Sequence, residues 1–115
     1  MISLQNYING TFVSAVSGKT LDNLDPATGK VYSLIPRSEQ ADVDAAVTAA
    51  EAAFPSWSNL SVEKRSEVLI RLADLIKSNS EALAQAETLD NGKPISLSRA
   101  VDIPRAEANI RFFAT

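Results

Sequence analysis

Hydrophobic and polar residues in the first third of the chain follow a period of two, which is typical of β-strands. In NYINGTFV, Asn9 and Gly10 separate two short runs of β-branched and aromatic residues, and this pair readily takes the positive φ angles of a type I′ turn. In TLDNLDPATGKVYSLIP, a turn from Pro26 to Gly29 separates two further strands, because proline presets its φ and glycine tolerates the exit geometry. We therefore expect a hairpin-rich β unit over about residues 6–36.

From Ser38 onward the apolar period changes to about 3.6, which is typical of amphipathic helices. Ser38 is a candidate N-cap of the first helix, Pro55 lies just beyond its end, and Ser61 is expected to cap the second helix. The fold class is therefore α+β, with four α-helices over about residues 39–54, 62–78, 81–90 and 95–113. The apolar stripes predicted to be buried are Val43, Ala46, Val47, Ala50 and Phe54 in the first helix and Val68, Leu69, Leu72, Leu75 and Ile76 in the second.

Strands and helices do not alternate in βαβ units, and neither GxGxxG nor a P-loop pattern occurs. We therefore expect no nucleotide site within this chain. The four amphipathic helices could close on one another, or they could need a further surface to cover their apolar stripes. The pattern leaves both arrangements open.

The fourth helical pattern contains a proline, in the stretch VDIPRAEANIRFF. Pro104 lacks the N–H of an internal helical position, and its ring meets the carbonyl of Ala100, so we expect a kink or a restart capped by Asp102. Arg105 then lies in the first turn of the restarted helix. It could pair with Asp102 or Glu107, or its planar fork could hold an anionic ligand such as a carboxylate.

The stretch ETLDNGKP ends the third helix, because Asn91 and Gly92 accept the left-handed conformation and Pro94 forbids continuation. Asp90 remains unexplained by this interpretation, since an anion at a helix C-terminus faces the negative end of the dipole. Lys93 could compensate it as a surface ion pair. A hard cation held by Asp90 and backbone carbonyls is the alternative.

Composition narrows the chemistry further. The 115 residues, 45% apolar and 22% charged, fit one globular domain or a piece of a larger protein. Cys and His are both absent, which removes the thiolate nucleophile, the usual neutral-pH acid and base, and the common zinc ligands. The net charge is −3, and the basic residues form no stripe that could bind the phosphate backbone of a nucleic acid. Without a signal-like N-terminus or a long apolar run, we expect a cytoplasmic protein that does not enter a membrane.

Five segments in this order resemble the N-terminal part of an NAD(P)-dependent aldehyde dehydrogenase: YINGTFV, DPATGKVY, DVDAAVTAAEAAFPSWS, RSEVLIRLADLI and ETLDNGKP. The resemblance covers essentially the whole chain. Within the family, DPATGKVY, AFPSWS, and DIPR followed by RFFA are most similar to the branch that oxidises 2-aminomuconate or 2-hydroxymuconate semialdehyde. The resemblance implies that residues 1–115 are an N-terminal segment, with the nucleotide-binding core and catalytic domain outside this chain.

The resemblance also implies roles for single residues. Asp90 would join the backbone carbonyls of Asn23 and Leu24 around a structural sodium or potassium ion, although Asp25 replaces the asparagine that often begins the turn at Pro26. Arg105 would bind the substrate carboxylate. The enzyme would use NAD, a cysteine nucleophile and a glutamate base to oxidise a small aldehyde, and would form a homo-oligomer.

This chain contains no cysteine, so the resemblance implies no catalytic or cofactor-binding residue within it, and we expect the chain alone to be inactive. A second hypothesis is a non-catalytic association module that self-assembles or binds a partner through apolar helix faces such as Leu69, Leu72 and Ile76.

Overall fold

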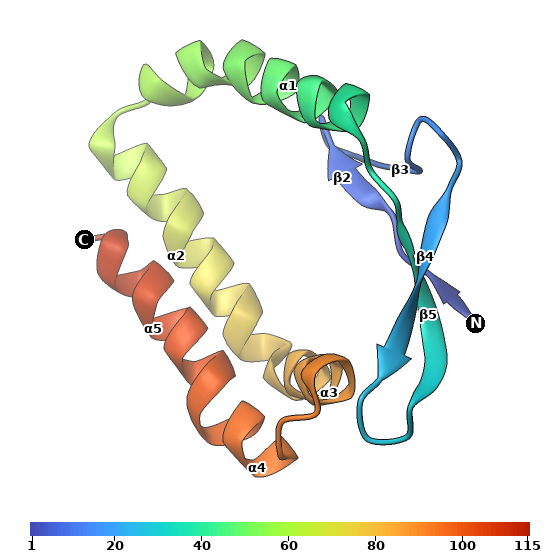
Figure 1. Ribbon diagram of the computed structural model, residues 1–115. Helices are drawn as coiled ribbons and strands as arrows, with labels where there is room; N and C mark the ends of the chain where they lie inside the picture. The colour runs from blue at the N-terminus through green and yellow to red at the C-terminus, as the bar shows by residue number, and fades with distance from the viewer. The chain divides into compact units, whose positions relative to one another are not determined.

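The computed structural model describes residues 1–115, which divide into two units, Met1–Asn59 and Leu60–Thr115. The first unit carries every strand and one helix, and the second unit is helical (Figure 1). This arrangement confirms the α+β fold class. None of the helices is both long and apolar enough to cross a membrane.

The strands of the first unit form two small sheets. Their bounds are β1 (Ile2–Ser3), β2 (Asn6–Ile8), β3 (Thr11–Val13), β4 (Thr20–Asp25) and β5 (Lys30–Pro36). Strands β2 and β3 pair with each other, and the other sheet has the order β1-β5-β4, with β1 parallel and β4 antiparallel to β5. The register of the β4–β5 pair shifts between Asn23 and Leu24.

Both predicted turns are confirmed. Asn9 and Gly10 connect β2 to β3 with φ angles of 52° and 77°, and Tyr7 lies opposite Phe12. At the second turn, the N–H of Gly29 donates to the carbonyl of Asp25 over 2.8 Å, and the Asp25 carboxylate accepts from the N–H of Ala27 over 2.9 Å. Such local side-chain bonds are the reason that aspartate favours turns.

Helix α1 (Gln40–Ser58) differs from the prediction at both ends. Its N-cap is Glu39, while the hydroxyl of Ser38 instead accepts a hydrogen bond from Asn6 over 2.8 Å. The buried Asp42 carboxylate accepts from the N–H groups of Glu39 and Val16, both over 2.9 Å, and these bonds lower its pKa. The predicted end before Pro55 is wrong: the helix continues to Ser58, and the carbonyl of Pro55 still accepts the N–H of Asn59 over 3.1 Å, so the proline removes a hydrogen bond without ending the helix.

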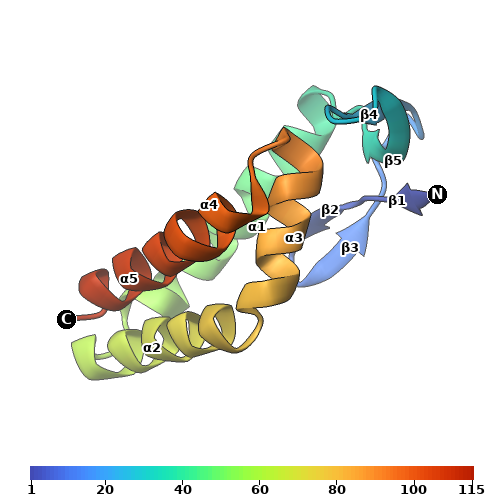
Figure 2. The ribbon, with the colours of Figure 1, turned by 90° about the horizontal axis from the view of Figure 1, so that it is seen from below.

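The second unit contains the other helical segments: α2 (Val62–Ser78), α3 (Ser80–Asn91), α4 (Ile95–Leu97), the π-helix η1 (Ser98–Asp102) and α5 (Ile103–Phe113). Ser61 caps α2 by accepting the N–H of Lys64, as predicted. Helix α5 runs antiparallel along α2 (Figures 1 and 2), with the Ser66 hydroxyl donating to the carbonyl of Ala114. Gly92 ends α3 in the left-handed conformation at φ 76°, also as predicted.

The predicted buried faces are largely exposed. The whole stripe of α1 is exposed, and on α2 only Leu69 and Ile76 are half-buried. The residues buried in the two units are all small or polar: Ala15, Ser33, Asp42, Ala73, Ala84, Ser98 and Ala114. The prediction was wrong for most stripe residues because neither unit supplies enough surface to cover an amphipathic helix. Phe112 and Phe113 stack edge to face at 5.2 Å and stay exposed.

Candidate functional site

The helix around Pro104 widens instead of breaking. The backbone remains right-handed helical at Ser98, Asp102 and Ile103, and the N–H of Ile103 donates to the carbonyl of Ser98, five residues back. Of the kink or restart expected at Pro104, the restart capped by Asp102 is wrong, because the backbone stays helical and Asp102 makes no capping hydrogen bond. A π-helical turn has i→i+5 hydrogen bonds, and this wider spacing gives the proline ring room beside the carbonyls of the preceding turn.

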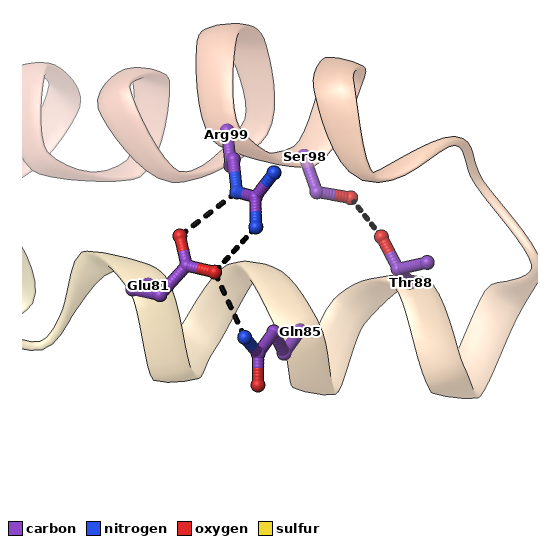
Figure 3. A network of polar contacts seen from close by, with 5 residues as sticks. All are labelled: Glu81, Gln85, Thr88, Ser98 and Arg99. Carbon is purple, nitrogen blue, oxygen red and sulfur yellow. Dashed lines mark hydrogen bonds and ion pairs between the residues drawn. The ribbon is translucent and has the colours of Figure 1, made fainter.

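Two side-chain contacts tie η1 to α3 (Figure 3). The hydroxyl groups of Thr88 and the fully buried Ser98 share a hydrogen bond of 2.9 Å. One residue further along, Arg99 donates to both carboxylate oxygens of Glu81 over 2.8 and 2.6 Å. The hydrogen bonds from Arg99, and then from Gln85, lower the pKa of Glu81 from 4.5 to about 2, and the same ion pair raises the pKa of Arg99.

The last residue of η1 makes a third contact. The ammonium of Lys93, in the loop after α3, lies 2.7 Å from Oδ2 of Asp102. This oxygen is buried, and the Lys93 ammonium at hydrogen-bond distance is its one polar contact. The close carboxylate raises the pKa of Lys93. From the sequence, Lys93 was one possible partner for Asp90. In the structure, Lys93 forms its ion pair with Asp102.

The side chain of Arg105 is exposed at the start of α5 and makes no hydrogen bond or ion pair in the structure. Both carboxylates considered as partners bind other cations. Asp102 pairs with Lys93, and Glu107 pairs with Arg111 over 2.9 Å. Of the two alternatives considered for Arg105, the internal ion pair with Asp102 or Glu107 is therefore wrong.

The residues of the predicted cation site lie in different units. Asp90 is exposed in the last turn of α3, in the second unit. Asn23 and Leu24 lie at the register shift of β4, in the first unit, where the Asn23 amide donates to Tyr32 over 3.0 Å and to Ser33 over 3.1 Å. No cluster of three or more Asp, Glu, His or Cys side chains suited to a metal ion occurs in the chain. A site built from one carboxylate and backbone carbonyls is not such a cluster, and it stays a prediction.

Sequence reasoning missed the contacts that hold η1. The steric conflict between Pro104 and the carbonyl of Ala100 was visible in the sequence, but its resolution by a wider turn was not. Thr88 and Ser98 carried no signal, because a hydroxyl pair ten residues apart has no characteristic spacing. The charges of Lys93 and Asp102 were visible, and only the fold of the connecting loop brings them together.

Comparison with known proteins identifies the family. The model of the aldehyde dehydrogenase family matches residues 12–115. The 2-aminomuconic semialdehyde dehydrogenase of Bos taurus is 51% identical over 115 residues, which are 100% of this chain and 23% of that protein. The 2-hydroxymuconic semialdehyde dehydrogenase of Pseudomonas sp. (strain CF600) is 44% identical over 115 residues, which are 99% of this chain and 24% of that protein.

Solved structures agree with this match. The crystal structure of PnpE, a protein of Pseudomonas sp. WBC-3, in complex with nicotinamide adenine dinucleotide is 48% identical and has a TM-score of 0.95. The match covers 96% of this chain and 23% of PnpE. The chain thus spans less than a quarter of these proteins' length, and it matches their N-terminal part. Since the family model covers nearly all of the chain and the fold agrees, the chain belongs to the aldehyde dehydrogenase family.

Proposed function

We propose that this chain is the N-terminal segment of an NAD-dependent enzyme that oxidises a carboxylated aldehyde, of the muconic semialdehyde type, to the acid. The proposal is supported by relatives named for 2-aminomuconic and 2-hydroxymuconic semialdehydes, which match the whole segment. A semialdehyde of this kind carries a carboxylate besides the reacting aldehyde. The enzyme therefore needs a cation placed to bind that carboxylate.

The observation that carries the proposal is the state of the three arginines between Ile95 and Phe113. Arg99 and Arg111 are both paired with carboxylates, whereas Arg105 is exposed and has no partner. A guanidinium offers two parallel N–H groups that match the two oxygens of a carboxylate. In this proposal Arg105 binds the substrate carboxylate and fixes the orientation of the aldehyde.

The reacting groups belong to the rest of the enzyme. The chain has no cysteine to attack the aldehyde and no glycine-rich loop for the phosphates of a dinucleotide. Nicotinamide adenine dinucleotide, when bound, supplies the hydride acceptor for the oxidation. The role of residues 1–115 is thus substrate binding and structural support, and the isolated chain should not turn over.

The cation site is part of the same proposal. Asp90 and the backbone carbonyls of Asn23 and Leu24 would hold a sodium or potassium ion, since such hard cations take carboxylate and carbonyl oxygens as ligands. The ion would also offset the unfavourable position of Asp90 at the C-terminal end of α3. The complete enzyme would be a cytoplasmic homo-oligomer.

The proposal is tested with the full-length enzyme that carries this segment. Initial rates of NADH formation are measured with 2-hydroxymuconate semialdehyde and with a neutral aldehyde of similar length. We expect a much higher kcat/KM for the carboxylated substrate and no NADH formation by the isolated 115-residue chain. Equal kcat/KM values would refute the proposed substrate class, and turnover by the isolated chain would refute its dependence on the rest of the enzyme.

The exposed apolar side chains favour a second candidate, an association module. On the helical unit, Leu75, Phe112 and Phe113 are 60%, 69% and 76% exposed, which is unusual for a protein that stays monomeric. Light scattering of the isolated chain separates the two candidates. A defined oligomer would support the association module, whereas a monodisperse monomer would contradict it.

A further inference from the structure

We propose that Lys93 is a specificity-determining residue that keeps Arg105 available for the substrate by engaging Asp102. This inference rests on the proposed function, in which Arg105 binds the substrate carboxylate. Lys93 touches neither the substrate nor Arg105 in this account. It acts through Asp102, so it is a positioning residue.

Asp102 lies where it could compete for Arg105. The two residues are three apart on a helical path, and residues at this spacing lie on the same side of a helix. Asp102 is therefore the carboxylate best placed along the helix to pair with Arg105. In such a pair the Asp102 carboxylate would occupy the guanidinium of Arg105, and its negative charge would repel the carboxylate of an incoming substrate.

Asp102 is already engaged by Lys93. Its Oδ2 atom lies 2.7 Å from the Lys93 ammonium and has no other polar partner. The side chain of Asp102 is only 25% exposed, so solvent screens its charge weakly. A partly buried carboxylate without its cation retains an uncompensated charge, which favours any cation within reach.

The same arrangement recurs on the other side of Arg105. Glu107 pairs with Arg111, which also binds Asp74 over 2.9 Å. Both carboxylates that flank Arg105 in the sequence are thus neutralised by other cations. The π-helical turn contributes because it fixes the segment that ends in Asp102, through the contacts of Ser98 and Arg99 with α3 (Figure 3).

The test uses the full-length enzyme and a pair of variants with opposite expected results. Lys93→Met removes the cation and keeps most of the side-chain volume. It should raise KM for the carboxylated semialdehyde by about threefold to tenfold, because the freed Asp102 pairs with Arg105 and repels the substrate. Adding Asp102→Asn to Lys93→Met should restore KM to near the wild-type value, since the competing charge is then gone.

Three further variants give controls. Lys93→Arg keeps the cation and should keep the wild-type KM. Lys77→Met makes the same change at an exposed lysine with no ion pair, and should leave both substrates unaffected. In an Arg105→Ala background, Lys93→Met should cause no further rise in KM. The melting temperature of every variant is measured, and a variant that no longer folds is left out of the KM comparison. Lys93→Arg and the double variant Lys93→Met, Asp102→Asn then still test the role of the charge at position 93.

The outcomes separate this inference from the proposed function. Failure of Arg105→Ala to discriminate between carboxylated and neutral aldehydes would overturn the proposed function itself. If Arg105→Ala does discriminate, an unchanged KM in Lys93→Met would overturn the role of Lys93. A raised KM that Asp102→Asn does not restore would also overturn it, because Lys93 would then act by direct contact or by general support of the loop.

Discussion

Replacing Arg105 by alanine tests the proposed binding of a substrate carboxylate most directly. Because Arg105 is exposed and its side chain makes no hydrogen bond or ion pair, its removal should change the free energy of unfolding by no more than about 0.5 kcal/mol. The loss of a charge-assisted, bidentate hydrogen bond to a desolvated carboxylate costs on the order of 2 to 4 kcal/mol. At about 1.36 kcal/mol per factor of ten, KM for the carboxylated semialdehyde should rise roughly 30-fold to 900-fold.

The assay compares KM and kcat for a carboxylated semialdehyde and a neutral aldehyde in the full-length enzyme. The neutral substrate makes no such contact, so its KM should change far less. Arg105→Lys should lie between wild type and Arg105→Ala, because lysine keeps the charge but loses the planar fork. Arg71→Ala removes another exposed arginine without an ion pair and serves as the matched control.

An equal rise of KM for both aldehydes would refute the reasoning. Arg105 would then support the structure of the helix or the access route and would not recognise a carboxylate. A large drop in thermal stability on Arg105→Ala would be equally damaging, since this side chain has no hydrogen bond or ion pair to lose.

Three further predictions concern the rest of the helical unit. Asp90→Ala should abolish the difference in melting temperature between sodium or potassium chloride and choline chloride in the full-length enzyme; a persisting difference would contradict the cation site. Glu81 has a pKa lowered from 4.5 to about 2 by Arg99, so its stabilising contribution is complete above pH 4.5 and disappears as the pH falls toward 2. Glu81→Gln should therefore lose less stability across this range than wild type, as measured by acid unfolding. Gly92→Ala should destabilise the unit by about 1 to 2 kcal/mol, because φ is 76° there, and Gly92→Asn should cost less; equal melting temperatures for the two variants would contradict this.

Local signals predicted most of the secondary structure. The Asn9-Gly10 turn, the cap at Ser61 and the end of α3 at Gly92 each depend on interactions within a few residues, so the sequence contains what determines them. Pro55 shows the limit of such signals. A proline reliably marks a lost hydrogen bond, but whether the helix continues depends on the following residues.

Burial could not be predicted in the same way. The apolar stripes of α1 and α2 are clear in the sequence, yet Leu72 and Leu75 remain exposed. A stripe indicates that a surface must be covered, and it does not indicate which part of a protein covers it. In a chain that spans less than a quarter of its relatives' length, the covering elements need not lie within the same chain.

The candidate site was predicted in its residues more than in its geometry. Arg105 and Asp90 could be named from the sequence and its resemblance to a family. The engagement of Asp102 by Lys93 depends on the loop after α3 and on the wider helical turn, and both are products of the fold. Lys93 and Arg105 are two cations that could pair with Asp102, and only the structure showed that Lys93 does so.

The buried carboxylate of Asp42 links two segments that would otherwise open separately. It accepts an N–H from Glu39 at the start of α1 and another from Val16, which lies in a loop outside every strand and helix. The amide proton of Val16 should therefore exchange with solvent at the rate at which the first turn of α1 opens, and more slowly than a loop amide without such a partner. We therefore expect the loop around Val16 and the first turn of α1 to open together as one cooperative unit in local unfolding.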